Sequence, residues 1–435
     1  MPSYRTLARN RDFTALWVGA TVSELGSRVT TFAMPLVAYA MTGSALWAAA
    51  AEAVFLLGMV AMLLPAGVLA DRRHRLRIMR FSLGSGALLY ASLVVAGATG
   101  LLTLPHLLAV ALLTGIATGL FAPAEYAAIR TVVATDELPT ALSQQQARQH
   151  VAALVGGPVG GALFGLARWA PFAADVVTYV LGWLLLGRVR ADLSPTSPTS
   201  PTSPTSPTSP ADRARPLHDL GDGLRFLWGR PFLRVLLLWS PAANLAINAL
   251  FFTALLRLVE AGFPAWQIGL VETAIGACGI LGAIAAPWLI DRFHTGRLTV
   301  AIAWSFVPLS IPLALWNHPW AMALAASFGL FLNPAGNAGV GSYRLAITPP
   351  ELVGRMQSTM QFASMVTMPL APALAGGLLA VLDGRDAVLA LTGLTALVAL
   401  IPTLSLSVRS VPRPAEWPRL PDPEPAPQPA PVPIG

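Results

Sequence analysis

Long hydrophobic stretches alternate with short polar segments along almost the whole chain. A helix that crosses a bilayer needs about 20 mostly apolar residues, and twelve segments of the sequence have that length and character. The pattern therefore predicts an all-α polytopic membrane protein with twelve transmembrane helices. The segments are residues 14–40, 45–70, 77–99, 104–125, 140–166, 171–189, 233–257, 266–290, 298–316, 320–342, 356–381 and 386–407.

Three polar or proline-rich regions interrupt this pattern. Residues 194–210 repeat the triplet Ser-Pro-Thr, which cannot build a core, so we expect an extended spacer. Residues 217–234 alternate apolar and polar positions at helical spacing, which indicates an amphipathic helix on the membrane surface. The end of the chain is proline-rich, and we expect it to be disordered. The chain then divides into an N-terminal six-helix bundle (1–190), a cytoplasmic linker (191–230), a C-terminal six-helix bundle (231–408) and a cytoplasmic tail (409–435).

Composition supports the membrane class. The chain is 55% hydrophobic and only 11% charged, whereas a soluble domain has roughly 25% charged residues. Its net charge of +7 comes from arginines at the ends of apolar segments, a distribution that argues against nucleic-acid binding. The single cysteine, Cys278, lies in an apolar segment, which excludes a disulfide framework and a cysteine metal site. We expect neither a metal nor a cofactor.

Arginine positions predict the orientation, because positive charge collects in short cytoplasmic loops. The segments around Arg73, Arg292 and Arg344 share one side, and Arg168 and Arg385 are almost alone on the other. Both termini should therefore be cytoplasmic, and the first residues contain no cleavable signal. All 28 basic residues are arginine, which is typical of a GC-rich bacterial genome. We expect a bacterial cytoplasmic membrane protein.

The two halves of the sequence repeat each other. Matched residues occur in the same order at two constant separations, which indicates a duplicated six-helix unit. The matches at 220 positions are Asp71 with Asp291, Arg72 with Arg292, and Glu52 with Glu272; those at 214 positions are Arg130 with Arg344 and Pro158 with Pro372. The separation of 220 also relates Glu24 to Asn244 and Arg28 to Asn248.

Several motifs resemble the major facilitator superfamily. The stretch "GVLADRRHRLR" matches the family's signature loop between its second and third helices, although His74 replaces a glycine, and "PWLIDRFHTGR" is its counterpart. "GGPVGG" resembles the proline-glycine signature of exporting members, and "NRDFTALWVG" and "ATDELPTALS" resemble the branch of enterobactin exporters and macrolide efflux proteins. The resemblance implies cytoplasmic gating by Gly67, Asp71, Arg72, Arg75, Asp291, Arg292 and Arg297. Close helix packing or a bend is expected at Gly157, Pro158, Gly161 and Pro372, because glycine lets backbones approach and proline removes a hydrogen bond; a direct role in the direction of export is the alternative.

Ionisable residues inside the predicted helices are the candidates for proton coupling, because each one costs about 2.5 to 3.5 kcal/mol to insert at mid-helix. Glu24 lies eleven residues beyond Phe13, about 16 Å into its helix, and Arg28 follows one turn later on the same face. Burial favours a neutral carboxyl group while the arginine favours the carboxylate, so the pair should respond to protons or ligand. The alternative is a structural pair that only offsets its own burial. Further proton-coupling candidates are Glu52, Asp175 and Glu272.

The resemblance also implies a midplane cavity between the halves. We expect Glu24, Arg28, Asn244, Asn248 and Asn333 on its polar faces, with Tyr39, Phe251 and Phe331 as apolar walls. In the polar run 143–150, Arg148 and His150 lie deepest, and a structural role is favoured for the histidine.

These features predict a secondary transporter that exports a small organic molecule, such as a drug, antibiotic or siderophore, in exchange for protons. The expected partners are the substrate, protons and the lipid bilayer, and we expect a monomer. A solute uptake system or a facilitator of the same fold is the first alternative. A membrane enzyme or a non-transporting sensor is disfavoured, because the six histidines are scattered and form no catalytic or metal constellation.

Overall fold

The computed structural model describes residues 7, 9–134, 137–194, 216–349 and 352–419. Each of the twelve predicted segments falls on a helix or on a pair of successive helices. Most of the Ser-Pro-Thr repeat and the end of the tail lie outside the described residues. The predicted amphipathic segment after the repeat forms the helix α9 (Pro216–Gly229). The predicted all-helical membrane fold is confirmed.

In the described part of the N-terminal half, seven helices pack around a shared apolar core. Its buried side chains include Met79, Tyr90, Leu93 and Phe172. The helices are α2 (Arg11–Thr42), α3 (Ala45–Ala61), α4 (Leu63–Arg72), α5 (Arg75–Ala98), α6 (Leu104–Val132), α7 (Leu138–Leu166) and α8 (Ala170–Leu186).

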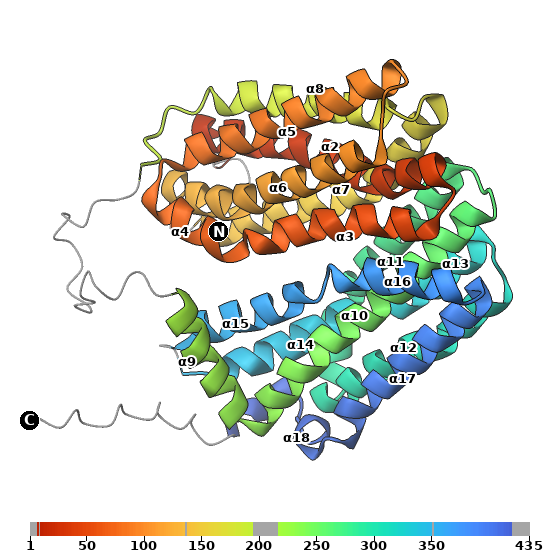
Figure 1. Ribbon diagram of the computed structural model, residues 1–435. Helices are drawn as coiled ribbons and strands as arrows, with labels where there is room; N and C mark the ends of the chain where they lie inside the picture. Colours follow the sequence, from red (N-terminus) through yellow and green to blue (C-terminus); the bar gives the residue numbers. More distant parts are fainter. Residues whose placement is uncertain (1–6, 8, 135–136, 195–215, 350–351, 420–435) are drawn as a thin grey trace, which may run out of the picture.

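The C-terminal half forms a second bundle (Figure 1). Its core includes Leu250, Ile268, Leu313 and Leu391. The helices are α10 (Pro231–Glu260), α11 (Ala265–Arg292), α12 (Thr295–Leu315), α13 (Pro319–Phe331), α14 (Asn333–Ala346), α15 (Val353–Val366), α16 (Leu370–Val381) and α17 (Gly384–Leu404), followed by the short α18 (Leu406–Arg409) and a 3-10 helix at Pro414–Arg419.

Proline explains why three of the predicted segments are pairs of helices. Pro65, in the first turn of α4, has no N–H for the carbonyl four residues earlier, and the helix breaks at Met62. The break between α13 and α14 at Leu332 precedes Pro334, and α16 begins directly after Pro369. Within the described residues, eight helices are long and apolar enough to cross a membrane, and α3 and α8 are apolar but shorter.

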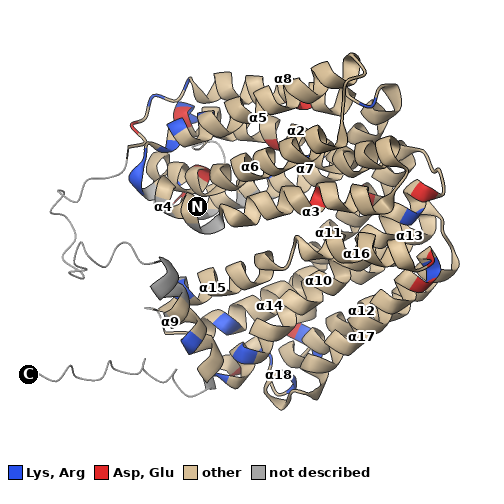
Figure 2. Cartoon of the chain, viewed as in Figure 1, with Lys and Arg blue, Asp and Glu red and all other residues tan. Residues whose placement is uncertain are grey.

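Among the described residues, the two halves pack closely at one end of the helices. Between them, α7 packs against α11 and α3 against α16. Figure 1 shows the halves converging near α13 and spreading apart at the end that carries α4 and α9. We call the latter the arginine-rich end, because Figure 2 shows basic residues gathered there in both halves, and the opposite one the far end.

Candidate functional site

A cavity of about 540 Å³ lies between the two halves. This volume is in the range of small-molecule sites, roughly 300 to 1,000 Å³. Helices α2, α3 and α6 form one wall, and α10, α11, α13, α15 and α16 form the other. The apolar lining combines aromatic rings with flexible thioethers: Phe55, Phe251, Phe252, Met59, Met322, Met365 and Met368. Such a surface can adapt to apolar molecules of different shape.

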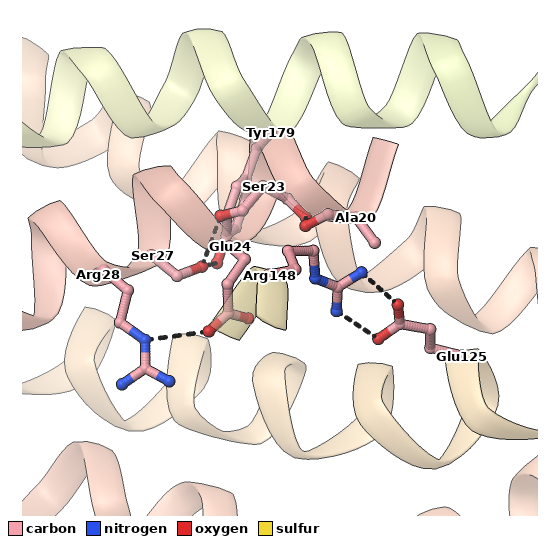
Figure 3. A network of polar contacts seen from close by, with 8 residues as sticks. All are labelled: Ala20, Ser23, Glu24, Ser27, Arg28, Glu125, Arg148 and Tyr179. Carbon is pink, nitrogen blue, oxygen red and sulfur yellow. Dashed lines mark hydrogen bonds and ion pairs between the residues drawn. The ribbon is translucent and has the colours of Figure 1, made fainter. Parts of the chain in front are cut away.

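Glu24 and Arg28 face this cavity from α2. The Nε of Arg28 donates to Oε1 of Glu24 over 3.0 Å, as their four-residue spacing predicts. The two side chains point the same way from α2 (Figure 3). That of Arg28 is 43% exposed and that of Glu24 is 25% exposed, and both line the cavity. The pair is therefore accessible to a ligand.

Two more carboxyl groups reach the cavity, one from each half. Glu52 comes from α3 and Glu272 from α11. Glu272 Oε2 occupies space left by Gly157, because a Cβ atom on that glycine would lie 2.7 Å from it. The described residues that line the cavity thus include three carboxyl groups and one guanidinium, that of Arg28.

The glycines of α7 allow close packing on two flanks. On the first flank, Gly156 and Gly160 face α2, where a Cβ atom on Gly160 would lie 2.9 Å from the carbonyl oxygen of Val29. Gly157 and Gly161 face α11, and a Cβ atom on Gly157 would lie 2.9 Å from the carbonyl oxygen of Gly269. At these glycines the backbone of α7 therefore lies directly against α2 on one flank and α11 on the other.

Pro158 adds a hydrogen bond between the halves. The helix α7 continues through Pro158 without a break, but proline has no N–H, which leaves the carbonyl of Leu154 without its usual partner four residues later. The hydroxyl of Thr273 in α11 donates to that carbonyl over 2.8 Å. The proline of the "GGPVGG" motif thereby provides an acceptor at the closed part of the interface.

Asp175 lies outside the cavity, buried inside the N-terminal half. Its Oδ1 accepts a hydrogen bond of 2.9 Å from Thr178, and a Cβ atom on Gly26 of α2 would overlap both groups. Its Oδ2 is buried and has no hydrogen-bond partner among the described residues. One turn away, the hydroxyls of Tyr179 and Ser27 are 2.9 Å apart (Figure 3). Asp175 thus packs on the side of α2 that faces α8.

A buried ion pair joins α6 to α7, and its acidic member, Glu125, was not among the predicted site residues. Arg148 donates to both oxygens of Glu125, over 2.6 and 3.1 Å, and the side chains are 2% and 4% exposed. Gln145 donates to Glu125 as well, over 3.2 Å. The predicted helix ended at residue 125, but α6 continues to Val132, which places Glu125 well inside it. In the sequence, only the polar run at residues 143–150 of α7 indicated that this helix could supply a partner for a buried carboxylate.

Two of the other predicted cavity residues line the cavity and four do not. Asn248 and Phe251 do. Asn244, one turn before Asn248, lines a separate hollow towards the arginine-rich end. The remaining residues pack elsewhere: Tyr39 packs beside α3 and α10, Phe331 packs against α11, and Asn333 accepts a hydrogen bond from Asn337. Phe331 and Asn333 flank the break at Leu332, where the direction of side chains cannot be extrapolated along one helix.

The predicted gating loops contact their own halves. Arg75 donates to Thr131 over 2.7 Å and its N–H to the carbonyl of Leu193 over 3.2 Å. Arg72 is exposed, no atom lies near enough to Gly67 to contact a Cβ there, and the side chain of Asp71 is outside the described part of the structure. Asp291, Arg292 and Arg297 border a hollow at the arginine-rich end of the other half. Pro372 lines the cavity.

Comparison with known proteins decides the family. The sequence profile of the Major Facilitator Superfamily matches residues 16–343. The chain belongs to the major facilitator superfamily. A curated relative, the uncharacterized MFS-type transporter y4rN of Sinorhizobium fredii (strain NBRC 101917 / NGR234), is 25% identical over 424 residues, which cover 94% of this chain and 98% of the relative.

Solved structures of other transporters share the fold. A bacterial homolog of the human lysosomal transporter Spinster, in an inward-facing and unoccupied conformation, matches with a TM-score of 0.71 at 15% identity and covers 94% of this chain and 98% of its own. The nucleoside transporter NupG (D323A mutant) matches with a TM-score of 0.70 at 12% identity, covering 90% and 99%. Superfamily members are multi-pass secondary transporters and not enzymes, so this chain moves a small solute across a lipid bilayer.

Proposed function

We propose that this transporter exports a small organic molecule in exchange for protons, as a monomer in the bacterial cytoplasmic membrane. The supporting observation is the excess of acidic over basic groups in the cavity: Glu24, Glu52 and Glu272 share it with the single guanidinium of Arg28. Full ionisation of all three carboxyl groups would leave an uncompensated negative charge between the halves. Binding of protons removes that charge, and an incoming substrate can displace them.

The orientation follows from the positive-inside rule, which assigns the arginine-rich end to the cytoplasm. The halves separate at that end (Figure 1), so the cavity would take its substrate from the cytoplasm, the first step of export. The far end, where α7 and α11 meet, would then be the outer gate. The predicted cytoplasmic gating fits this proposal, because a gate on the cytoplasmic side should be open in an inward-facing arrangement.

The lining of the cavity supports an apolar organic cargo. Aromatic rings and methionine side chains supply adaptable apolar contacts, and the sequence resemblance to enterobactin exporters and macrolide efflux proteins favours the same class. Glu24 is the first choice for the proton carrier because Arg28 can compete with a proton for its carboxylate. Asp175, which is buried behind α2, is the second choice for the proton carrier.

Inverted membrane vesicles test this function. We expect a proton gradient, acidic inside, to drive uptake of ethidium or erythromycin, and a protonophore to abolish it. Glu24→Gln should abolish driven uptake and leave exchange of labelled for unlabelled compound intact. Glu416→Gln, at the chain end, is the matched control. If proton-driven uptake survives Glu24→Gln, the proton carrier would instead be Glu52 or Asp175. If uptake does not depend on the proton gradient, the protein would be a facilitator.

A further inference from the structure

Two adjoining hollows lie at the arginine-rich end of the C-terminal half, with volumes of about 560 and 620 Å³. Arg297 lines both, Arg409 lines the first, and Arg292 and Arg413 line the second. Arg292 is the last residue of α11 and Arg297 lies in the first turn of α12, while Arg409 and Arg413 come from the segment after α17. Asp291 is the one acidic residue among the described residues of the lining.

This arrangement is held in place by backbone contacts. The N–H of Gly296 donates to the carbonyl of Val411 over 3.2 Å. A side chain on Gly296 would overlap the carbonyl oxygen of Val408, so the segment after α17 can lie directly on the start of α12. Val408 and Val411 are both buried. Arg409 and Arg413 are therefore presented from a fixed segment beside Arg297.

The N-terminal half has a similar backbone contact at the start of α5, but there a carboxylate lies beside it. There the N–H of Arg75 donates to the carbonyl of Leu193 over 3.2 Å, and Asp192, the preceding residue, lies 3.7 Å from Nε2 of His74. Hydrogen bonds from Ser194, and the nearby His74, lower the pKa of the Asp192 carboxyl group, so it stays ionised at neutral pH. The basic loop of that half thus has its own carboxylate.

The C-terminal half has no carboxylate at the corresponding position. Ser410 precedes Val411 where Asp192 precedes Leu193. Among the described residues, Arg292, Arg297 and Arg413 form no ion pair, and Arg409 donates only to the carbonyl of Thr403, over 3.4 Å. The hollows therefore combine several guanidinium groups with little to neutralise them, which suits an anion.

Exposed aromatic rings beside the second hollow indicate a lipid environment. Trp288, which lines it, is 62% exposed, and Phe293 is 44% exposed. Their ring centroids are 6.3 Å apart in an edge-to-face arrangement. Aromatic residues at the end of a transmembrane helix, next to arginine, are typical of the headgroup region of a bilayer.

We propose that these hollows bind the headgroup phosphate of an anionic phospholipid, with its glycerol and upper acyl carbons against Trp288 and Phe293. Arginine suits this ligand because its planar guanidinium donates two parallel hydrogen bonds to phosphate oxygens. The lipid joins the turn between α11 and α12 to the segment after α17. The proposal is independent of the transported substrate.

Lipid binding to the purified full-length protein in detergent tests the proposal. Native mass spectrometry would titrate phosphatidylglycerol, with phosphatidylcholine as the uncharged comparison. The variant Arg297→Gln/Arg409→Gln should bind phosphatidylglycerol about 30-fold more weakly, since each arginine near a charged headgroup contributes about fivefold. Arg72→Gln/Arg73→Gln is the matched control, because it removes the same charge from the exposed loop of the other half.

Three outcomes would overturn the proposal. The two variants could weaken binding equally, which would indicate diffuse electrostatic attraction; phosphatidylcholine could bind as tightly as phosphatidylglycerol; or glycerol phosphate could compete at the concentration at which the lipid binds, which would indicate a soluble anion. Arg297→Lys/Arg409→Lys guards against misfolding. It keeps the charge and loses the paired donors, so its affinity should fall between those of the wild type and the glutamine variant.

Discussion

Gly269 offers the sharpest test of the interface between the halves. Its Cα faces α7, and a Cβ atom there would overlap the carbonyl of Gly157 and lie 2.7 Å from the nitrogen of Pro158. Both obstacles are backbone atoms in a helix, which cannot rotate away as a side chain can. Ordinary contacts between such atoms need about 3.5 to 4.0 Å. In Gly269→Ala, α7 and α11 must therefore separate by roughly 1 Å at their crossing.

The cost falls on the arrangement in which the far end is closed. Overpacking by one methyl group costs about 1 to 3 kcal/mol. If the two helices part when the far end opens, the open arrangement does not bear this cost. The ratio of open to closed molecules should then rise by about 5- to 150-fold. Stability of the two bundles themselves should change little, because the new methyl group lies between them.

Cysteine labelling measures this shift. Cys278 is the sole cysteine of the chain, so a Cys278→Ser background carrying Leu255→Cys places one thiol in the cavity wall. We expect a membrane-impermeant maleimide, added outside intact cells, to label this thiol faster when Gly269→Ala is introduced.

Gly279→Ala is the control for this experiment. It adds the same methyl group to the same helix, at a position where no atom lies within 4 Å of the new Cβ. Equal labelling rates for the two variants, or slower labelling with Gly269→Ala, would refute the argument that backbone contact at this crossing keeps the far end closed.

Three further substitutions test other contacts. Thr273→Val removes the donor to the α7 carbonyl, worth about 1 kcal/mol, so labelling at the far end should rise about fivefold, whereas Thr273→Ser should restore the wild-type rate. Glu125→Gln leaves Arg148 buried without its counter-charge and should destabilise the detergent-solubilised protein by about 3 to 5 kcal/mol in thermal unfolding; an unchanged midpoint would contradict the pairing. Gly26→Ala would overlap the Asp175 carboxylate and should cost about 1 to 3 kcal/mol, unlike Gly165→Ala, where the space is open.

The helices could be predicted because a membrane span needs a long apolar segment, and such segments are visible one at a time. The contact between Glu24 and Arg28 was predictable for a related reason, since a four-residue spacing places them on one helical face. The pairing of Glu125 with Arg148 was not, because these residues lie on different helices and meet only when α6 and α7 pack. Periodicity carries information within a helix and none about its neighbours.

The residues that line the cavity could be predicted only in part. The predicted cavity residues lie on α2, α10 and the α13–α14 pair, and α3, α11, α15 and α16 line the cavity as well. Each helix presents only part of its surface to it. Asn248 lines the cavity while Asn244, one turn away, belongs to another hollow. Phe331 and Asn333 lie at a proline-dependent break, where the direction of side chains changes. Whether a predicted residue lines the cavity therefore depends on its depth along the helix and on the break between α13 and α14.

The glycines of α7 connect the gate to the acidic cavity. Gly157 is the residue against which both the backbone of Gly269 and the carboxyl group of Glu272 pack. Separation of α7 from α11 must therefore uncover the side of the Glu272 carboxyl group that Gly157 covers. A proton or ligand that binds Glu272 differently in the two arrangements then shifts the gate, and the gate shifts binding by the same factor. Glycine at position 157 makes this linkage possible, because a side chain there would separate the carboxyl group from the helix that moves.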